Sequence, residues 1–255
     1  MKYATYAAWR DRAETRPIDL SVVIPAYNET DRIVPTIGAF AAHLSQSDLA
    51  WELIVSDDGS TDATRELIDL LEHANVFVIE APANAGKGAA VRRGLLGARG
   101  RMVLFSDADN ATPAHELDAL VREIEAGADV AIASRAADGS SVNNRSMLRS
   151  TLTAGLRWIV KLGLGVGVRD TQCGFKLFTA DAARRIAAAQ TVEGFSFDLE
   201  ILYLARRFRY TVAEVPVAWY DAPGSKVDPA KEAVRFLVSI FRIRLNGLRG
   251  VYRNA

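Results

Sequence analysis

Apolar and polar positions alternate in blocks along the first half of the chain. Five short runs rich in apolar and β-branched residues are each followed by a polar loop or by a segment in which apolar residues recur with helical spacing. The predicted strands are 20–25, 51–56, 75–80, 101–106 and 128–133, and the predicted helices are 31–46, 62–73, 87–98 and 113–126. Continuous apolar runs are typical of strands buried on both faces, so the pattern predicts an α/β fold with a mostly parallel sheet and helices on both sides.

The rhythm changes in the second half of the chain. A polar loop at 136–144 is followed by a helix, a glycine-rich stretch at 163–167, a strand and helix pair, and a long final helix. Neither a repeat nor a low-complexity linker separates the halves, and 255 residues with 49% hydrophobic content suit one domain with a sizeable core.

The composition narrows the class of partner. The 31 basic and 31 acidic residues balance, so overall charge gives no argument for nucleic acid as a partner. Cys173 is the single cysteine, which excludes an intramolecular disulfide or a cysteine-based zinc site and favours a reducing compartment. We expect residues 1–17, which carry charges and no long apolar stretch, to be neither a signal peptide nor a membrane span.

Two aspartates follow the fourth apolar run. Asp107 and Asp109 stand two positions apart, so their carboxylates point the same way while the strand lasts or where the following turn re-aims them. Mg²⁺ in proteins is usually held by one or two carboxylates together with substrate phosphates. The pair therefore predicts a metal site, and the alternative is a polar turn before the helix that begins at Pro113.

Polar loops also follow neighbouring strands, and in such sheets ligands bind beyond the carboxyl ends of the strands. Tyr27 offers a flat face to a base, while Glu29 and Asp57 offer acceptors for a ribose hydroxyl and a nucleobase edge. Gly86 and Lys87 open the third predicted helix, where backbone amides and an ammonium suit a diphosphate. Each of these segments also reads as an ordinary cap, turn or helix start, and both interpretations stay open.

Taken in order, seven short motifs carry a family likeness over nearly the whole chain. They are Val23–Glu29, Asp57–Asp62, Asn84–Gly88, Asp107–Asp109, Ser134–Arg135, Asp170–Lys176 and Gly194–Asp198. This set resembles the family 2 glycosyltransferases of the GT-A fold, and is most similar to the polyprenyl-phosphate (dolichyl-phosphate) glucosyltransferases and mannosyltransferases. The resemblance implies a Rossmann-like nucleotide-diphospho-sugar transferase that forms one domain over 1–255. In that domain about 18–134 would bind the nucleotide sugar and about 135–255 would shape the acceptor side.

The resemblance also implies roles for residues that match the family motifs. The nucleotide-binding set is Pro25, Tyr27, Asn28, Glu29, Asp57, Gly86, Lys87 and Asp107. The acceptor-phosphate set is Arg135, Arg149, Thr153 and Lys226, of which Lys226 lies in a loop with the composition of a closing lid. The metal set is Asp107 and Asp109 with Mg²⁺ or Mn²⁺, and the catalytic set is Asp107, Asp109, Arg135 and Asp198.

The implied reaction is an inverting transfer of glucose from UDP-glucose to a polyprenyl phosphate. Asp170–Lys176 looks more like the glucosyl than the mannosyl branch, and Ala111 stands where mannosyl enzymes often carry a glutamine metal ligand. A polyprenyl phosphate is already an anion at neutral pH, so guanidinium groups that grip it matter more than a strong base. The alternatives are transfer of mannose or another hexose, a soluble acceptor, and a nucleotide-sugar-binding module that is not an enzyme.

Two helices carry polar stripes that combine basic residues with apolar neighbours. In the final helix the stripe is Arg235, Ser239, Arg242, Asn246 and Arg249, and in the earlier helix it is Ser146, Arg149, Thr153, Arg157 and Lys161. Such helices either cover the core or lie at a membrane interface. Since the lipid tail of the acceptor must stay in the bilayer, we expect a cytoplasmic protein attached peripherally to the inner face of the cell membrane.

Overall fold

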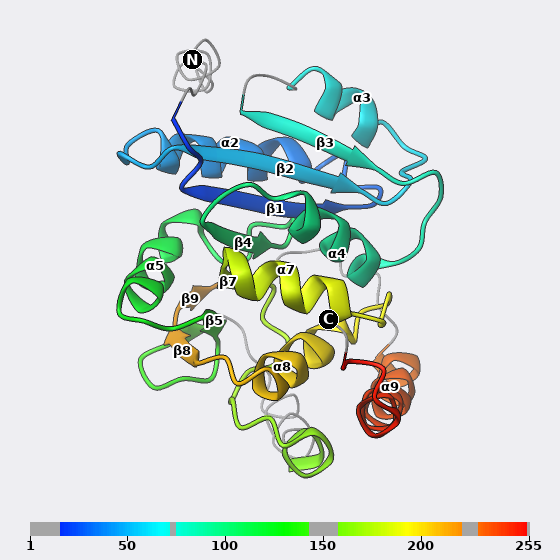
Figure 1. Ribbon diagram of the computed structural model, residues 1–255. Coiled ribbons are helices and arrows are strands. Elements are labelled where there is room, and N and C mark those ends of the chain that lie inside the picture. Colours follow the sequence, from blue (N-terminus) through cyan, green and yellow to red (C-terminus); the bar gives the residue numbers. More distant parts are fainter. Residues whose placement is uncertain (1–15, 72–74, 143–157, 221–228, 254–255) are drawn as a thin grey trace.

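A seven-stranded sheet forms the centre of the molecule (Figure 1). The computed structural model describes residues 16–71, 75–142, 158–220 and 229–253. The strands are β1 (Leu20–Ala26), β2 (Trp51–Asp57), β3 (Val76–Glu80), β4 (Met102–Ser106), β5 (Val130–Ser134), β6 (Ser141–Val142), β7 (Phe175–Thr179), β8 (Val212–Pro216) and β9 (Ala218–Trp219). Their order in the main sheet is β3-β2-β1-β4-β7-β5-β8, and β6 pairs with β9 in a separate two-stranded ladder.

The sheet is parallel except at β7. β1 pairs in parallel with β2 and β4, whereas β7 runs antiparallel between β4 and β5. Parallel strands end at the same edge, and an antiparallel neighbour begins there, so Phe175 lies opposite Ser106. The segment that leads into β7 is thereby placed beside the loop that leaves β4.

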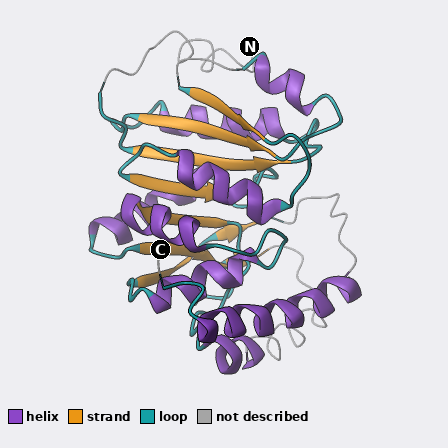
Figure 2. Ribbon diagram, turned by 45° about the vertical axis from the view of Figure 1, so that its right-hand side comes forward, coloured by secondary structure: helices purple, strands orange, loops and turns teal. Residues whose placement is uncertain are grey.

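Helices cover both faces of this sheet (Figures 1 and 2). They are α2 (Ile33–Leu44), α3 (Thr64–Asp69), α4 (Lys87–Gly97), the 3₁₀ turn η1 (Ala114–Glu116), α5 (Leu117–Glu125), α7 (Ala180–Ala189), α8 (Phe197–Arg207) and α9 (Pro229–Arg249). Side chains of α4, α7, α8 and α9 form one buried apolar cluster, and those of α2, α3 and α5 form another. The two clusters lie on opposite faces because successive strand residues point to opposite sides of the sheet.

The predicted mixed α/β architecture is confirmed, and all five predicted strands of the first half are present. The predicted helix at 113–126 begins instead as the short turn η1 before α5. The second half departs further from the prediction, since α8, β8 and β9 were not expected and β6 lies within the predicted polar loop at 136–144. Strands of two residues carry no periodicity, and α8 is buried on nearly every side, so neither leaves a clear amphipathic pattern.

The final helix, α9, buries only a narrow face. Phe236, Ile240 and Ile243 pack into the core, and Asn246 donates a hydrogen bond to Thr191. Other apolar side chains of this helix are exposed, namely Leu237, Val238, Phe241 and Leu248. The described part of α9 therefore presents a mixed apolar and basic surface, because only an arc of about one residue per turn contacts its neighbours. None of the helices in the described ranges combines the length and hydropathy needed to cross a bilayer.

Candidate functional site

Asp107 and Asp109 lie in a rigid turn at the end of β4. The backbone N–H of Asp107 donates to the carbonyl of Gly174 at 2.9 Å, and Thr36 Oγ1 donates to the carbonyl of Ala108 at 2.6 Å. Asn110 has a φ of 52°, a left-handed conformation that bends the chain after the second aspartate. Strand pairing and side-chain hydrogen bonds therefore fix both carboxylates at this edge of the sheet.

Gly174 leaves room for the first of these carboxylates. A Cβ at this position would overlap the carboxylate group of Asp107. The carbonyl of Gly174 thus accepts a hydrogen bond from Asp107, and the absence of a side chain at Gly174 leaves space for the Asp107 carboxylate. The sequence placed this glycine within a family motif but gave no physical reason for it.

The start of α4 brings a cation to the same turn. Lys87 Nζ lies 2.7 Å from Asp107 Oδ1 and 5.9 Å from the ring centroid of the half-exposed Phe195. Gly86, immediately before the helix, has a φ of 112°, and a side chain there would meet the carbonyl of Glu193 at 2.5 Å. Glycine is therefore needed at this helix start because two backbones approach each other closely.

Asp58 organises the turn that presents Lys87. Its buried carboxylate accepts hydrogen bonds from the backbone N–H groups of Ala85 and Gly86, at 3.0 and 2.6 Å, and forms an ion pair with Arg93 at 2.6 Å. The sequence interpretation treated Asp58 only as part of an ordinary turn. Asp58 directly follows Asp57 in a polar loop, and nothing in that loop signals that its partners lie 27 to 35 residues later in the chain.

The loops after β1 and β2 are joined to each other. Asn28, with a φ of 55°, accepts a hydrogen bond from the N–H of Thr61, and its own N–H donates to Ser60 Oγ. Asp57 accepts from Ser60 through both carboxylate oxygens, at 3.1 and 2.5 Å. Tyr27 is 42% exposed at this edge. Three residues of the predicted nucleotide-binding set are therefore held close together, with the tyrosine ring open to solvent.

Glu29 and Pro25 complete the predicted set on this side. Glu29 forms a two-pronged ion pair with Arg32, at 2.5 and 2.8 Å, so its carboxylate already has a cationic partner. Pro25 is buried within β1, where it shapes the end of the strand.

Arg135 follows β5 and is held by a buried carboxylate. Its Nε and one terminal nitrogen lie 2.7 and 2.9 Å from the two oxygens of Asp170, and its guanidinium lies 5.4 Å from the ring centroid of Trp219. Burial alone would raise the pKa of Asp170, but the hydrogen bonds and charge of Arg135 outweigh burial and lower it to about 2. Some of the N–H groups of the guanidinium thus hold Arg135 in place.

A second buried ion pair lies beneath the site. Lys176 is fully buried in β7, and its Nζ donates to Asp198 Oδ1 at 2.5 Å and to the carbonyl of Cys173 at 2.5 Å. Burial raises the pKa of Asp198 despite this partner. Glu200, the other acidic residue of α8's first turn, is buried and accepts hydrogen bonds from Thr191, Val192 and Tyr252, so it joins α8 to the segment before it and to the residues after α9.

The electrostatics of the acidic turn suit a cation. Burial and then the charge of Asp107 raise the pKa of Asp109, which shows that two carboxylates share a poorly solvated space. Burial lowers the pKa of Lys87, but the carboxylates around it outweigh burial and raise it. Within the described ranges no group of three or more His, Cys, Asp or Glu side chains forms a complete metal cage. The two aspartates therefore offer part of a coordination shell.

Most of the predicted site residues converge on one edge of the sheet, where β1, β2 and β4 end and β7 begins. The predicted acceptor residues Arg149, Thr153 and Lys226 lie outside the described residues. Reasoning from the residue pattern missed the partners that hold the site, namely Asp58, Asp170, Gly174 and Lys176. The only signal for three of them was their place in one family motif.

The sequence was compared with protein families and with curated proteins, and both comparisons point to glycosyltransferases. The family model "Glycosyl transferase family 2" matches residues 21–188. A dolichyl-phosphate beta-glucosyltransferase of Dictyostelium discoideum is 38% identical over 93% of this chain and 78% of its own length. The enzymes of the same name from Saccharomyces cerevisiae and Homo sapiens are 36% and 35% identical, over 96% and 92% of this chain and 79% and 77% of their own lengths.

Solved structures share the fold at lower sequence identity. Glucosyl-3-phosphoglycerate synthase from Mycobacterium tuberculosis, crystallised with Mn²⁺ and UDP-glucose, superposes with a TM-score of 0.66 at 21% identity, covering 96% of this chain and 83% of its own. The family model, the relatives that match over most of this chain and more than three quarters of their own length, and the acidic turn at the end of β4 all agree. The chain belongs to glycosyltransferase family 2 and is an enzyme of the hexosyltransferase class with a GT-A fold.

Proposed function

We propose that this enzyme transfers glucose, with inversion, from UDP-glucose to a polyprenyl phosphate of the dolichyl type. The observation that carries the proposal is the identity of 34–38% with dolichyl-phosphate beta-glucosyltransferases, which in the first of them extends over 93% of this chain. A shared acceptor is the simplest reason for similarity that extends beyond the nucleotide-binding half. The fold neighbours that act on phosphoglyceric acid are only about 20% identical, so they give weak support to a soluble acceptor.

The donor would lie along the edge where β1, β2 and β4 end. Tyr27 would stack on the base, Asp57 would accept from the base edge, and the N-terminus of α4 with Lys87 would face the diphosphate. Asn28 would hold the two nucleoside loops together, as it does without a ligand. Glu29 would have to share its carboxylate between Arg32 and a ribose hydroxyl.

The site also fits a divalent metal. Asp107 and Asp109 supply two hard oxygen ligands, and the raised pKa of Asp109 is relieved when a cation replaces the proton. Mg²⁺ or Mn²⁺ bound there would neutralise the charge that develops on the departing diphosphate. The incomplete cage leaves positions for phosphate oxygens and water. A fold neighbour bound to Mn²⁺ and UDP-glucose supports this choice.

The acceptor phosphate would approach from the side of Arg135. Because a phosphate monoester is already anionic, the chain has to place and desolvate it rather than deprotonate it. Arg135, oriented by Asp170, keeps N–H groups that are not used in that ion pair. Arg149, Thr153 and Lys226 would complete the phosphate site, and Asp198 would orient the sugar from its place at the start of α8.

We further propose that the exposed face of α9 rests on the membrane that contains the acceptor. Leu237, Val238, Phe241 and Leu248 are 47–72% exposed, and Arg242 lies among them. Apolar side chains next to basic ones are typical of interfacial helices, and each basic residue near an anionic surface contributes about 1 kcal/mol.

A donor and acceptor panel tests the reaction. Labelled UDP- and GDP-sugars are incubated with short polyprenyl phosphates and with Mg²⁺ or Mn²⁺, and the lipid product is extracted and counted. We expect label to move from UDP-glucose only, and only when lipid phosphate and metal are both present. Preferred use of GDP-mannose, or equal turnover with phosphoglyceric acid and no lipid, would overturn the proposal.

Flotation with anionic vesicles tests the membrane surface. Phe241→Asp and the Arg235→Ala/Arg242→Ala/Arg249→Ala variant should each lower the floated fraction several-fold, while Arg122→Ala, an exposed arginine on α5, should not. Unchanged flotation of both variants would remove α9 from the interface.

A further inference from the structure

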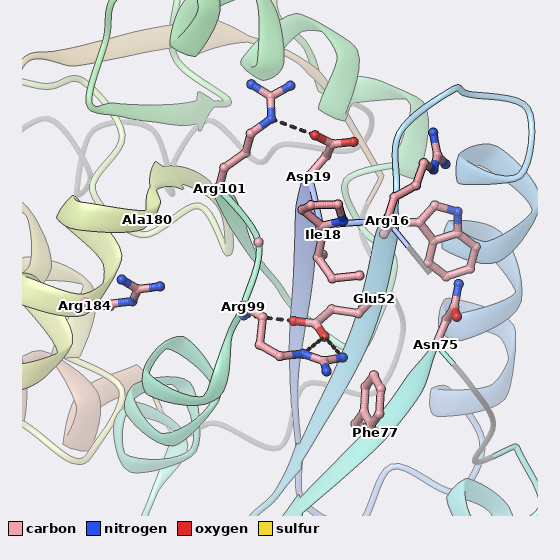
Figure 3. Close-up of a pocket in the computed structure, with 13 residues that line it drawn as sticks. Arg16, Ile18, Asp19, Glu52, Asn75, Phe77, Arg99, Arg101, Ala180 and Arg184 are labelled. Atoms are coloured by element: carbon pink, nitrogen blue, oxygen red, sulfur yellow. Dashed lines mark hydrogen bonds and ion pairs between the residues drawn. The ribbon is translucent and has the colours of Figure 1, made fainter. Parts of the chain in front are cut away.

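A cavity of about 640 Å³ lies at the edge of the sheet opposite the catalytic turn (Figure 3). It is bounded by the residues that lead into β1 and β4, by the first residues of β2, and by the start of α7. Parallel strands run away from it, so the cavity and the Asp107 turn lie at the two ends of the same strands. Its volume falls in the range of small-molecule sites, and no residue of the proposed reaction lines it.

Arginines dominate the charge of this cavity. Four arginines and two carboxylates line it, which leaves an excess of positive charge; the arginines are Arg16, Arg99, Arg101 and Arg184. Asp19 holds Arg101 at 2.8 Å, and the fully buried Glu52 holds Arg99 at 2.5 Å. Both arginines are thus oriented by a carboxylate while keeping further N–H donors. Arg184 forms no hydrogen bond or ion pair with the residues that the structure describes, and Figure 3 shows its guanidinium beside the cavity.

One residue that lines the cavity has a polar atom with no hydrogen-bond donor among the described residues. Asn75 is only 7% exposed, and its Oδ1 is buried and accepts no hydrogen bond from the described part of the chain. A buried polar atom without a partner costs about 1–3 kcal/mol, which a donor from a bound molecule would recover. Next to it the guanidinium of Arg99 stacks at 4.6 Å on the ring of Phe77, which closes the wall with a flat, rigid surface.

We propose that this cavity binds a small organic phosphate that also carries hydroxyl or amino groups, of the sugar-phosphate or nucleoside-monophosphate class. The excess of guanidinium groups around the cavity favours a phosphate over a neutral sugar, since each guanidinium presents paired N–H donors to phosphate oxygens. The unpaired Oδ1 of Asn75 favours a molecule that carries a hydroxyl or amino donor apart from its phosphate group, which inorganic phosphate lacks. The inference is independent of the donor and acceptor proposed for the catalytic edge.

Calorimetry with three probes tests the proposal: inorganic phosphate, glucose 6-phosphate and AMP. We expect at least one organic phosphate to bind at least tenfold more tightly than inorganic phosphate. Arg184→Ala should weaken that binding at least fivefold, and Asn75→Asp, which places a negative charge at the orphan acceptor, should weaken it further. Circular dichroism and the unfolding midpoint verify that both variants are folded.

Two control variants locate the binding. Arg122→Ala removes an exposed arginine of α5, and Lys87→Ala alters the catalytic edge, so neither should change the affinity. Binding that Lys87→Ala removes and Arg184→Ala spares would assign the probe to the catalytic edge and overturn the proposal. Absence of binding by all three probes, or equal affinity for inorganic phosphate, would overturn it as well.

Discussion

Asp170→Asn removes the charge that holds Arg135 and should destabilise the protein by an amount that depends on pH. Both partners are mostly shielded from solvent, with side-chain exposures of 22% for Arg135 and 6% for Asp170, so the pair is only weakly screened. The carboxylate also accepts a hydrogen bond from the backbone N–H of Arg135 at 3.0 Å. Its replacement by a neutral amide therefore leaves the guanidinium without its counter-charge.

The pKa of Asp170 sets the size of the effect. A folded-state pKa of about 2, against about 3.9 in an unfolded chain, corresponds to about 2–3 kcal/mol at 1.36 kcal/mol per unit. Because the folded value is depressed, this stability is fully present above about pH 4 and is lost as the pH falls towards 2. The difference between wild type and Asp170→Asn should thus be about 2–3 kcal/mol at pH 7 and should shrink steadily below about pH 4.

Urea unfolding of both proteins at several pH values between 3 and 7 measures this difference. Asp138→Asn is the matched control, because Asp138 pairs with Arg169 at 2.9 Å but is 93% exposed, and its loss should cost less than about 0.5 kcal/mol. A difference for Asp170→Asn that is absent at pH 7, or that does not change between pH 5 and pH 3, would refute the reasoning. The variant should also raise the KM for the acceptor more than the KM for the donor.

Three further substitutions test the site. Asp109→Ala should lower kcat about 100-fold or more. The urea midpoint should stay unchanged or rise, because the variant removes a carboxylate whose pKa is raised by burial and by Asp107. Nearly normal turnover would exclude a metal role for Asp109. Gly174→Ala should cost about 1–3 kcal/mol and most of the activity, whereas Gly167→Ala, where a Cβ meets nothing, should do neither. Lys176→Met should cost about 3–5 kcal/mol in urea unfolding because Asp198 stays buried without a partner, and the double variant Lys176→Met/Asp198→Leu should recover much of that loss; a double variant as unstable as the single would contradict this account.

The first half of the fold could be predicted from the sequence because its strands are buried on both faces. Every residue of β1, β2, β4 and β5 is buried, so each reads as a mainly apolar run followed by a polar loop. The place of β7 could not be predicted in this way. Its antiparallel insertion between β4 and β5 depends on pairing with residues about 45 to 75 positions earlier, which leaves no local periodicity.

In the candidate site, too, some residues could be predicted from the sequence and others could not. Asp107, Asp109 and the Gly86–Lys87 turn could be recognised because strand ends, acidic pairs and glycines before helices have local signatures. Asp58 and Lys176 could not, because a charged residue reads as solvated unless its partner is known. Both are buried, and both have their partners on elements distant in the sequence, Arg93 on α4 and Asp198 on α8.

The segment 170–176 has a physical explanation once these partners are known. Asp170 fixes Arg135 after β5, Gly174 accepts from and makes room for Asp107 after β4, and Lys176 reaches Asp198 at the start of α8. Each contact joins a different element to one short stretch of chain, and all three are possible because β7 enters the sheet from the edge where its parallel neighbours end. A displacement of this segment would therefore move the acidic turn, the guanidinium and the buried carboxylate together. For this reason we expect a change that displaces the whole segment, such as Gly174→Ala, to impair donor and acceptor use together. Asp170→Asn should act mainly on the acceptor, and changes in the loops after β1 and β2 should affect the donor alone.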